Sequence, residues 1–489
     1  MHRLLRHALI VTALLVSPAF AKNAPESKTF AAVDERFFRV ELGGQRVGTL
    51  HTQRIEGEDR VMSRERMSMT LGRSGTQLTI SSDQRQEETR EGRPVSFASR
   101  TDAAGSVSEW EGRIDKDGSL RINVRRGNAP RIDRMPWPRN ALLSEGLRLT
   151  QMKHGFAAGA RYRMTAFDID GLQAYDIDVE VGKAVNMNVN NRKERLIPVQ
   201  QILHFPRGTT ESTSWVRKDG TLRRSQLSVM GLELTMTACD RACDQDRVDD
   251  TDVLAATLAP APRPLTLPER HQPLELLLEA DGSASASIDT LGDVPGQQLR
   301  HDAEPGRFRL RIDPVGSGGQ SPGPDDLRAT RWLQSDDPKL LDFARSHSQG
   351  KDGAASIMAA LERAVREHIS NKSLRVGYAS ASETLHSREG DCTEHALLLA
   401  ALARASGIPA RVATGLVYTD RYGEQRDVFI PHAWVQAWVD GQWRGYDAAL
   451  NGMDSGHLAI AVGDGDPYRY YQGMSVLGNL KIIEAGAAQ

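Results

Sequence analysis

The sequence predicts a multidomain protein with an N-terminal antiparallel all-β domain, a small middle β segment and a C-terminal α+β domain. The chain has 489 residues, which is too long for a single hydrophobic core. Strand-like runs broken by turn dipeptides fill its first half, whereas apolar residues recur every four positions after about residue 350. We therefore place the β domain at 35–245, the middle β segment at 265–314 and the α+β domain at 327–486.

The N-terminal domain is predicted from its turns and from the runs between them. Asp117-Gly118, Asp170-Gly171 and Asp219-Gly220 are dipeptides typical of tight turns. The β-forming runs between such turns indicate a curved half-barrel or a sandwich, and none of them suggests an active site. The clearest runs are Val47–Thr52, Gln77–Ser81, Leu120–Val124 and Tyr175–Val181.

Two linkers bound the middle segment. Leu258–Pro264 is rich in proline, and Val315–Pro324 is rich in glycine, serine and proline. We expect three short strands between them, at Leu274–Leu278, Ala284–Ile288 and Arg307–Ile312.

The C-terminal domain begins with helices and continues with strands, which is typical of an α+β fold. The first helix is indicated by one apolar face, formed by Ile357, Leu361, Val365 and Ile369. A second helix starts at Asp391 or Cys392 and runs through Ala405, and Gly407 and Pro409 end it. Strands are expected at 411–418, 429–439, 443–447, 458–462 and 480–484.

Residues 1–21 predict a cleavable export signal. Arg3 and Arg6 precede a short apolar core, and Ala19-Phe20-Ala21 fits a small-x-small cleavage site. A membrane anchor is the alternative, but the apolar run is too short to span a bilayer. We expect a periplasmic or secreted protein with no integral membrane segment after signal removal. Lys plus Arg (62) do not exceed Asp plus Glu (64), so no nucleic-acid partner is expected.

The three cysteines divide into a pair and a single residue. Cys239 and Cys243 lie close together, and in an oxidising compartment a disulfide is the expected link between them. Half of a metal site is the alternative, but further ligands are missing nearby, so we expect neither a metal nor a cofactor. Cys392 stands outside this pair, and a reactive thiol would explain its presence.

Cys392 lies at the predicted start of the second helix. The first-turn N–H groups and the helix dipole favour a thiolate there, and a thiolate is the nucleophilic form of cysteine. Asp391 opposes this through like-charge repulsion, so a histidine partner is needed. A small buried core residue is the alternative, and the position at a helix start favours the nucleophile.

His432 and Asp447 are predicted to face each other across a hairpin. Asp440-Gly441 is a strong two-residue turn signal. The resulting register places Asp447 on the face of His432 and diagonal to it, whereas a slip of one residue would send it to the opposite face. An exposed histidine and a strand-end aspartate are the alternative. We predict that His432 is the base and that Asp447 is its orienting acid.

Other residues near Cys392 remain open. His395 shares a helix face with Cys392 and is the rival base, but it lacks an orienting acid, so a structural role is expected. Glu394 is expected to be solvated or paired. The backbone N–H of Cys392 is the first candidate to stabilise an oxyanion, and the second donor is left open. Its unranked candidates are Tyr378, Ser380 and Ser382.

The sequence contains four characteristic motifs, Gly390–Ala396, Leu402–Arg411, Pro431–Val435 and Tyr446-Asp447. They closely resemble the bacterial transglutaminase-like superfamily, and the resemblance covers about residues 331–483. It implies a papain-like α+β fold and a Cys-His-Asp triad at Cys392, His432 and Asp447. It does not fix the reaction, because the superfamily includes proteases, amidases, cross-linking enzymes and inert members.

Three functions are compatible with these residues. The first is an exported cysteine protease or amidase, which acts on a protein or peptide substrate through a thioester intermediate. The second is a protein-glutamine gamma-glutamyltransferase, in which an amine resolves the same thioester. The third is a non-catalytic envelope binding or scaffold protein, which an intact triad disfavours.

Overall fold

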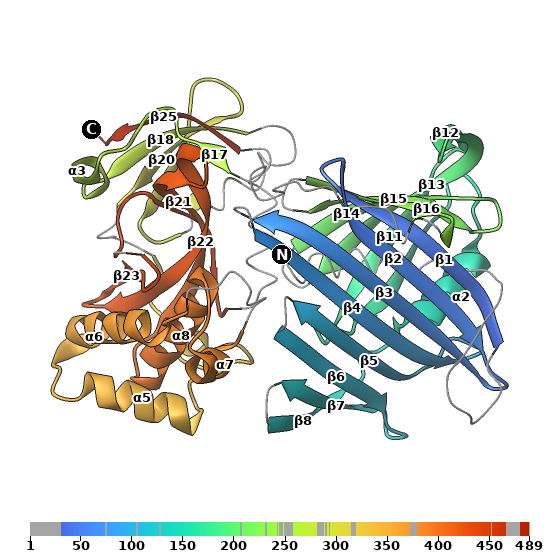
Figure 1. Cartoon of the computed structure of the whole chain (residues 1–489), viewed down its shortest axis with the longest axis horizontal. Coiled ribbons are helices and arrows are strands. Elements are labelled where there is room, and N and C mark those ends of the chain that lie inside the picture. Colours follow the sequence, from blue (N-terminus) through green and yellow to red (C-terminus); the bar gives the residue numbers. More distant parts are fainter. Residues whose placement is uncertain are drawn as a thin grey trace. The chain divides into compact units, whose positions relative to one another are not determined.

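The computed structural model divides the chain into two compact units, Met1–Val253 and Leu254–Gln489 (Figure 1). The predicted signal at residues 1–21 lies outside the described residues. The structure describes residues 31–73, 76–103, 106–126, 129–205, 208–229, 232–241, 243, 248, 258–280, 288, 291–292, 294–313, 319–371, 379–450, 452–465 and 480–488.

The N-terminal unit is built on one 16-stranded sheet, so the all-β prediction is confirmed and the sandwich alternative is not (Figure 1). Neighbouring strands are antiparallel except where β10 meets β9. The sheet order is β8-β7-β6-β5-β4-β3-β2-β1-β16-β15-β14-β13-β11-β10-β9, and β12 pairs with β13. The bounds are β1 Ala31–Leu42, β2 Gln45–Glu56, β3 Arg60–Arg73, β4 Thr76–Thr89, β5 Pro94–Ala103, β6 Ser106–Ile114, β7 Ser119–Arg126, β8 Ala129–Pro136, β9 Ala141–Leu142, β10 Arg161–Asp168, β11 Gln173–Val181, β12 Val185–Val189, β13 Arg192–Phe205, β14 Gly208–Val216, β15 Leu222–Val229 and β16 Leu232–Cys239.

Helix α2 (Ser144–His154) is fixed to the sheet by buried charges. Glu88 of β4 accepts hydrogen bonds from the backbone N–H groups of Glu145 and Gly146, where the helix begins. Glu145 in turn forms two hydrogen bonds of 2.8 Å with Arg54 of β2. These contacts satisfy backbone N–H groups at the helix start, and the Glu145 carboxylate in the first turn places negative charge where the helix dipole favours it.

Glu65 of β3 is a buried carboxylate in this sheet. It lies opposite Gln84 of β4, and its burial raises the pKa of its carboxyl group to about 8. Tyr175 of β11 lies near enough for its own pKa to be raised by burial and by the charges of Asp168 and Glu65. A carboxyl group in such a position carries a desolvation cost whenever it ionises.

The C-terminal unit combines helices with a five-stranded sheet of order β17-β22-β21-β24, to which β23 is added by pairing with β22. The predicted α+β class is therefore confirmed. The first helix expected from the sequence is α6 and the second is α8, whereas α5 and α7 were not predicted. The helices are α3 Leu267–Arg270, α5 Pro338–Ser348, α6 Gly353–His368, α7 Ala381–Ser387 and α8 Cys392–Ala405, with a 3-10 turn η4 at Pro324–Asp326. The strands are β17 Ala259–Pro260, β21 Ala410–Tyr422, β22 Gln425–Val439, β23 Gln442–Tyr446 and β24 His457–Gly463.

Strand β22 separates two hydrophobic clusters because its side chains alternate between the two faces of the sheet. Trp434 belongs to the second cluster, together with Val294, Ala413 and Ala459. The first cluster joins α5, α6 and α8 to the sheet, and its members from β22 are Ala433, Val435, Ala437 and Val439.

The middle segment is joined to the end of the chain by a four-stranded sheet of order β19-β20-β18-β25. Strand β18 pairs with both β20 and β25, and Leu278 lies opposite Ile482. The proline-rich segment that precedes it is paired as well, because Ala259 lies opposite Phe429 of β22. The bounds are β18 Leu274–Ala280, β19 Gln297–His301, β20 Arg307–Ile312 and β25 Leu480–Ala487.

Candidate active site

Cys392 is the first residue of α8 and is half-buried. Asp391 precedes it as the N-cap, and its carboxylate accepts a 2.8 Å hydrogen bond from the backbone N–H of Thr393. The other two cysteines, Cys239 and Cys243, form the predicted disulfide. Cys392 is therefore the thiol that lies at a helix N-terminus, as the sequence predicted.

Glu394 is fully buried, so the expectation that it is solvated is wrong; its carboxylate is held by backbone N–H groups. Its carboxylate accepts the backbone N–H of Ala379 at 2.8 Å and that of Asp391 at 2.9 Å. A Cβ at Gly390 would come within 2.3 Å of the Glu394 side chain, so glycine is needed for this close approach. Glu394 thus fixes the backbone at Ala379 and at Asp391, the residue before Cys392. Burial raises the pKa of the Glu394 carboxyl group well above its usual value.

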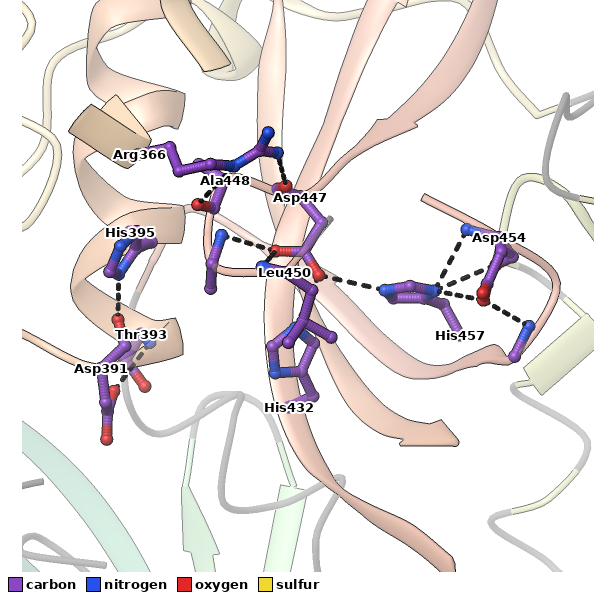
Figure 2. A network of polar contacts seen from close by, with 12 residues as sticks. Arg366, Asp391, Thr393, His395, His432, Asp447, Ala448, Leu450, Asp454 and His457 are labelled. Atoms are coloured by element: carbon purple, nitrogen blue, oxygen red, sulfur yellow. Dashed lines mark hydrogen bonds and ion pairs between the residues drawn. The ribbon is translucent and has the colours of Figure 1, made fainter. Parts of the chain in front are cut away.

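His395 lies one turn into α8 and is buried. Its Nδ1 atom is 2.6 Å from the carbonyl oxygen of Asp391, in the first turn of the same helix (Figure 2). This contact agrees with the structural role that we expected for His395.

The hairpin between β22 and β23 has the predicted register. Asp440 and Gly441 both have positive φ, at 53° and 79°, as a tight two-residue hairpin turn requires. Val439 pairs with Gln442, and the ladder continues to Tyr446, the residue before Asp447. His432 Nε2 and Asp447 Oδ2 are 2.8 Å apart, and both side chains are buried. The predicted contact between these two residues is therefore confirmed.

The Asp447 carboxylate accepts four hydrogen bonds from the described residues (Figure 2). Oδ1 receives the backbone N–H groups of Ala449 and Leu450 at 2.8 and 3.1 Å. Oδ2 receives Nε2 of His432 and, at 3.1 Å, Nε2 of a second histidine, His457. Burial opposes ionisation of this carboxyl group, but the charges and hydrogen bonds of the two histidines outweigh it and hold its pKa far below the usual range.

Sequence reasoning missed His457, the first residue of β24. Its ring lies between two carboxylates, with Nε2 toward Asp447 and Nδ1 3.1 Å from Asp454 Oδ1. Asp454 is bound on its other side by Arg270 of α3. Burial lowers the pKa of His457, but the hydrogen bonds that it donates to Asp447 and Asp454, and the charges of these two residues, outweigh this and raise it to about 9.

Trp434 covers both histidines from the same strand face. Its ring centroid is 5.2 Å from that of His457 in an edge-on arrangement and 6.1 Å from that of His432. Trp434 is buried and belongs to a hydrophobic cluster, so it shields this part of the site from water. A water-free surrounding strengthens each charge interaction inside it.

The ligand atoms of His432, Asp447 and His457 all lie within 4.8 Å of one another, which is close enough to hold a metal ion. Such an ion would have to displace the hydrogen bonds that both imidazoles donate to Asp447. The geometry therefore fits two imidazole N–H groups that donate to one carboxylate.

Two of the three candidates for a second oxyanion donor lie in described residues. Ser380 caps α7, where its hydroxyl accepts the backbone N–H of Glu383. Ser382 donates its hydroxyl to Asp337 at 2.7 Å. Both hydroxyls are therefore engaged in local structure, and Tyr378 lies outside the described residues.

Comparison with known proteins finds a family model that matches the part of the chain around Cys392, His432 and Asp447. A model of the transglutaminase-like superfamily matches residues 342–448. A stretch of 98 residues is 32% identical to an uncharacterized protein of Mycobacterium leprae (strain TN), over 19% of this chain and 33% of that protein. This chain thus spans a third of the length of that relative. The C-terminal unit carries a transglutaminase-like domain.

Three solved structures are similar to this chain over different shares of its length. A protein of Cytophaga hutchinsonii that is proposed to be a cysteine protease matches 45% of this chain and 84% of its own, at 19% identity and a TM-score of 0.27. A beta-barrel-like protein from Brucella abortus, of a domain of unknown function, matches 42% and 94%, at 10% identity and a TM-score of 0.33. A proposed protease from Parabacteroides distasonis matches 74% and 69%, at 9% identity and a TM-score of 0.19. Within the described residues, no helix is long and apolar enough to cross a membrane.

Proposed function

We propose that the transglutaminase-like domain is a cysteine protease or amidase that cleaves amide bonds of a protein or peptide substrate. Cys392 is the nucleophile, His432 is the general base and acid, and Asp447 orients His432. The observation that carries this proposal is the buried contact of 2.8 Å between His432 and Asp447. A histidine held in this way by a buried aspartate has a defined tautomer, which a general base needs.

The contact between His432 and Asp447 also determines which ring nitrogen of His432 exchanges a proton. Nε2 of His432 is engaged with Asp447, so Nδ1 is the atom that exchanges a proton with the Cys392 sulfur. The thiolate attacks the amide carbonyl carbon, and the helix start at Cys392 stabilises the oxyanion. His432 then gives its proton to the leaving nitrogen as the C–N bond breaks, and a thioester remains.

Water resolves the thioester in the second half of the reaction. His432 takes a proton from the water molecule, whose oxygen attacks the thioester carbon. The C–S bond breaks, the carboxylic acid leaves, and the sulfur recovers its starting state. An amine in place of water would give transamidation by the same steps, so the two reactions differ only in the acceptor.

We also propose that the protein is exported. Residues 1–21 have the features of a cleavable signal, and the disulfide between Cys239 and Cys243 suits an oxidising compartment. Intact mass of the protein recovered from the periplasm or the medium tests this directly. The expected species starts at Lys22, and a full-length protein in the cytoplasm would contradict export.

The test of the reaction is intact-mass analysis after incubation of the mature protein with a library of peptide amides, with and without an added amine. Hydrolysis of the peptides that depends on Cys392 supports the proposal. Peptides joined to the amine, with no hydrolysis, would replace it by transamidation. The matched controls are Cys392→Ala, which should abolish turnover, and His386→Gln, an exposed histidine on α7 that should leave it unchanged. Equal turnover by wild type and Cys392→Ala would refute the assignment.

A further inference from the structure

We infer that His457 is a positioning residue of the site: it acts through Asp447 to hold His432 in its reactive orientation. The inference rests on the proposed function and adds a residue to it. His457 lies outside the motifs that carried the sequence prediction and beyond the residues 342–448 that match the superfamily model.

The Asp447 carboxylate is restrained on both of its oxygens. The four hydrogen bonds that it accepts from described residues come from fixed groups, two from backbone N–H groups on Oδ1 and two from imidazoles on Oδ2. If His457 were lost, Oδ2 would keep only its contact with His432. Rotation of the carboxylate about its Cβ–Cγ bond would then be less restrained, and the ring of His432 would follow it. A small misplacement of a catalytic group can lower the rate strongly.

The charges around His457 stabilise its protonated form. Arg270, Asp454, His457 and Asp447 form a line in which basic and acidic groups alternate. Each carboxylate in this line has a cation on both sides when His432 carries its proton. His457 also has an acceptor on each ring nitrogen. Asp447 Oδ2 lies 3.1 Å from Nε2, and Asp454 offers Nδ1 its Oδ1 at 3.1 Å and its carbonyl oxygen at 3.0 Å. The backbone N–H of Asp454 is more distant from Nδ1, at 3.4 Å. The surroundings of His457 are therefore those of an imidazolium ion.

A local irregularity of the sheet brings His457 to this place. Strand β21 lies between β22 and β24, with Gly415 opposite His432 and Val417 opposite His457. The β21–β24 ladder shifts register between Thr414 and Gly415, where a Cβ on Gly415 would lie 2.0 Å from the Leu458 carbonyl oxygen. This close approach follows directly after His457 and sets its position along the sheet.

The experiment uses the full mature protein and two variants. His457→Gln keeps a neutral N–H donor that can reach Asp447 but removes the charge. Asp454→Asn leaves His457 in place and removes the carboxylate that faces its Nδ1. His386→Gln is the matched control, because it changes an exposed histidine of the same unit. Circular dichroism and thermal melts confirm that each protein is folded.

Two readouts are compared across pH 4–10. The first is the alkylation rate of Cys392 by iodoacetamide, which needs no substrate. The second is kcat/KM for the best peptide amide. In His457→Gln we expect kcat/KM to fall by about tenfold or more, as for other residues that orient a catalytic ligand. The alkylation rate should reach half its plateau at a higher pH, because less positive charge remains around the thiolate. Asp454→Asn should change both readouts in the same direction, and the control should match wild type.

Nitrogen-15 NMR of the histidine rings gives a third, independent readout. His457 should remain doubly protonated at pH 8 in wild type and should lose that signature in Asp454→Asn. If His457→Gln does not fold, the Asp454→Asn variant and this spectrum carry the test. A purely structural role for His457 would lower stability and leave both pH profiles unchanged, and that result would overturn the inference. Altered alkylation in a protein that turns over no amide would instead refute the proposed function alone.

Discussion

Replacing Glu65 by Gln should stabilise the N-terminal unit at alkaline pH. Burial raises the pKa of Glu65 to about 8, from 4.5 in the absence of that environment. The folded state therefore binds a proton that the unfolded state releases between these two values. Stability falls as pH rises through this window, because ionisation of a buried carboxyl group is disfavoured only in the folded state.

The size of the effect follows from the same two values. The difference between 4.5 and about 8 corresponds to about 5 kcal/mol, at about 1.36 kcal/mol per pH unit. This loss of unfolding free energy is absent below about pH 4.5 and is fully present above about pH 8. For a unit of this size, about 5 kcal/mol corresponds to roughly 10–20 °C in melting temperature. Glutamine keeps the shape of the side chain and cannot ionise, so Glu65→Gln should escape this loss.

Differential scanning calorimetry of the full chain between pH 5 and pH 9 measures this effect. The melting transition of the N-terminal unit should fall with pH more steeply in wild type than in Glu65→Gln. Glu111→Gln is the matched control, because it removes an exposed carboxylate from β6 of the same sheet. Parallel curves for wild type and Glu65→Gln would show that Glu65 is hydrated or compensated in the folded state, and they would refute the reasoning.

Three further outcomes are expected. Gly415→Ala should destabilise the C-terminal unit by about 1–3 kcal/mol, measured by urea unfolding, because its Cβ would overlap the Leu458 carbonyl oxygen; an unchanged midpoint would show that the bulge adapts. Glu394→Ala should cost about 2–4 kcal/mol in the same assay, since two backbone N–H groups lose their acceptor, whereas Glu394→Gln should cost less; equal losses would contradict this. Limited proteolysis should cut between residues 314 and 331. The two fragments should co-elute, because β18 before the cut pairs with β25 after it; separation on gel filtration would refute this.

Local sequence signals were sufficient for the hairpin and the helix of the site. Asp440-Gly441 defines a two-residue turn, and that turn fixes the register that brings His432 to Asp447. The start of α8 at Cys392 follows from an acidic N-cap before an apolar run. These features depend on residues a few positions apart, and such interactions leave a readable pattern.

Features that depend on residues far apart in the sequence could not be predicted from local patterns. His457 begins a strand without any motif of its own, and its role appears only when β21 and β24 are paired. The burial of Glu394 depends on a contact with Ala379, fifteen residues before it. The pairing of the middle strands with β25 joins segments that are far apart in sequence, for which a local pattern carries no information.

The pairing of β18 with β25 also constrains the order in which the chain folds. Leu278 and Ile482 face each other across about two hundred residues, so this sheet gains its fourth strand only after that whole segment has been synthesised. Until then the apolar side chains of β18 lack the strand β25 that pairs with them. This favours an extended or chaperone-bound state of the chain. A chain that crosses a membrane through a narrow translocation channel must be unfolded during passage. Under the export that we propose, late closure would leave this sheet incomplete until its last strand, β25, is available.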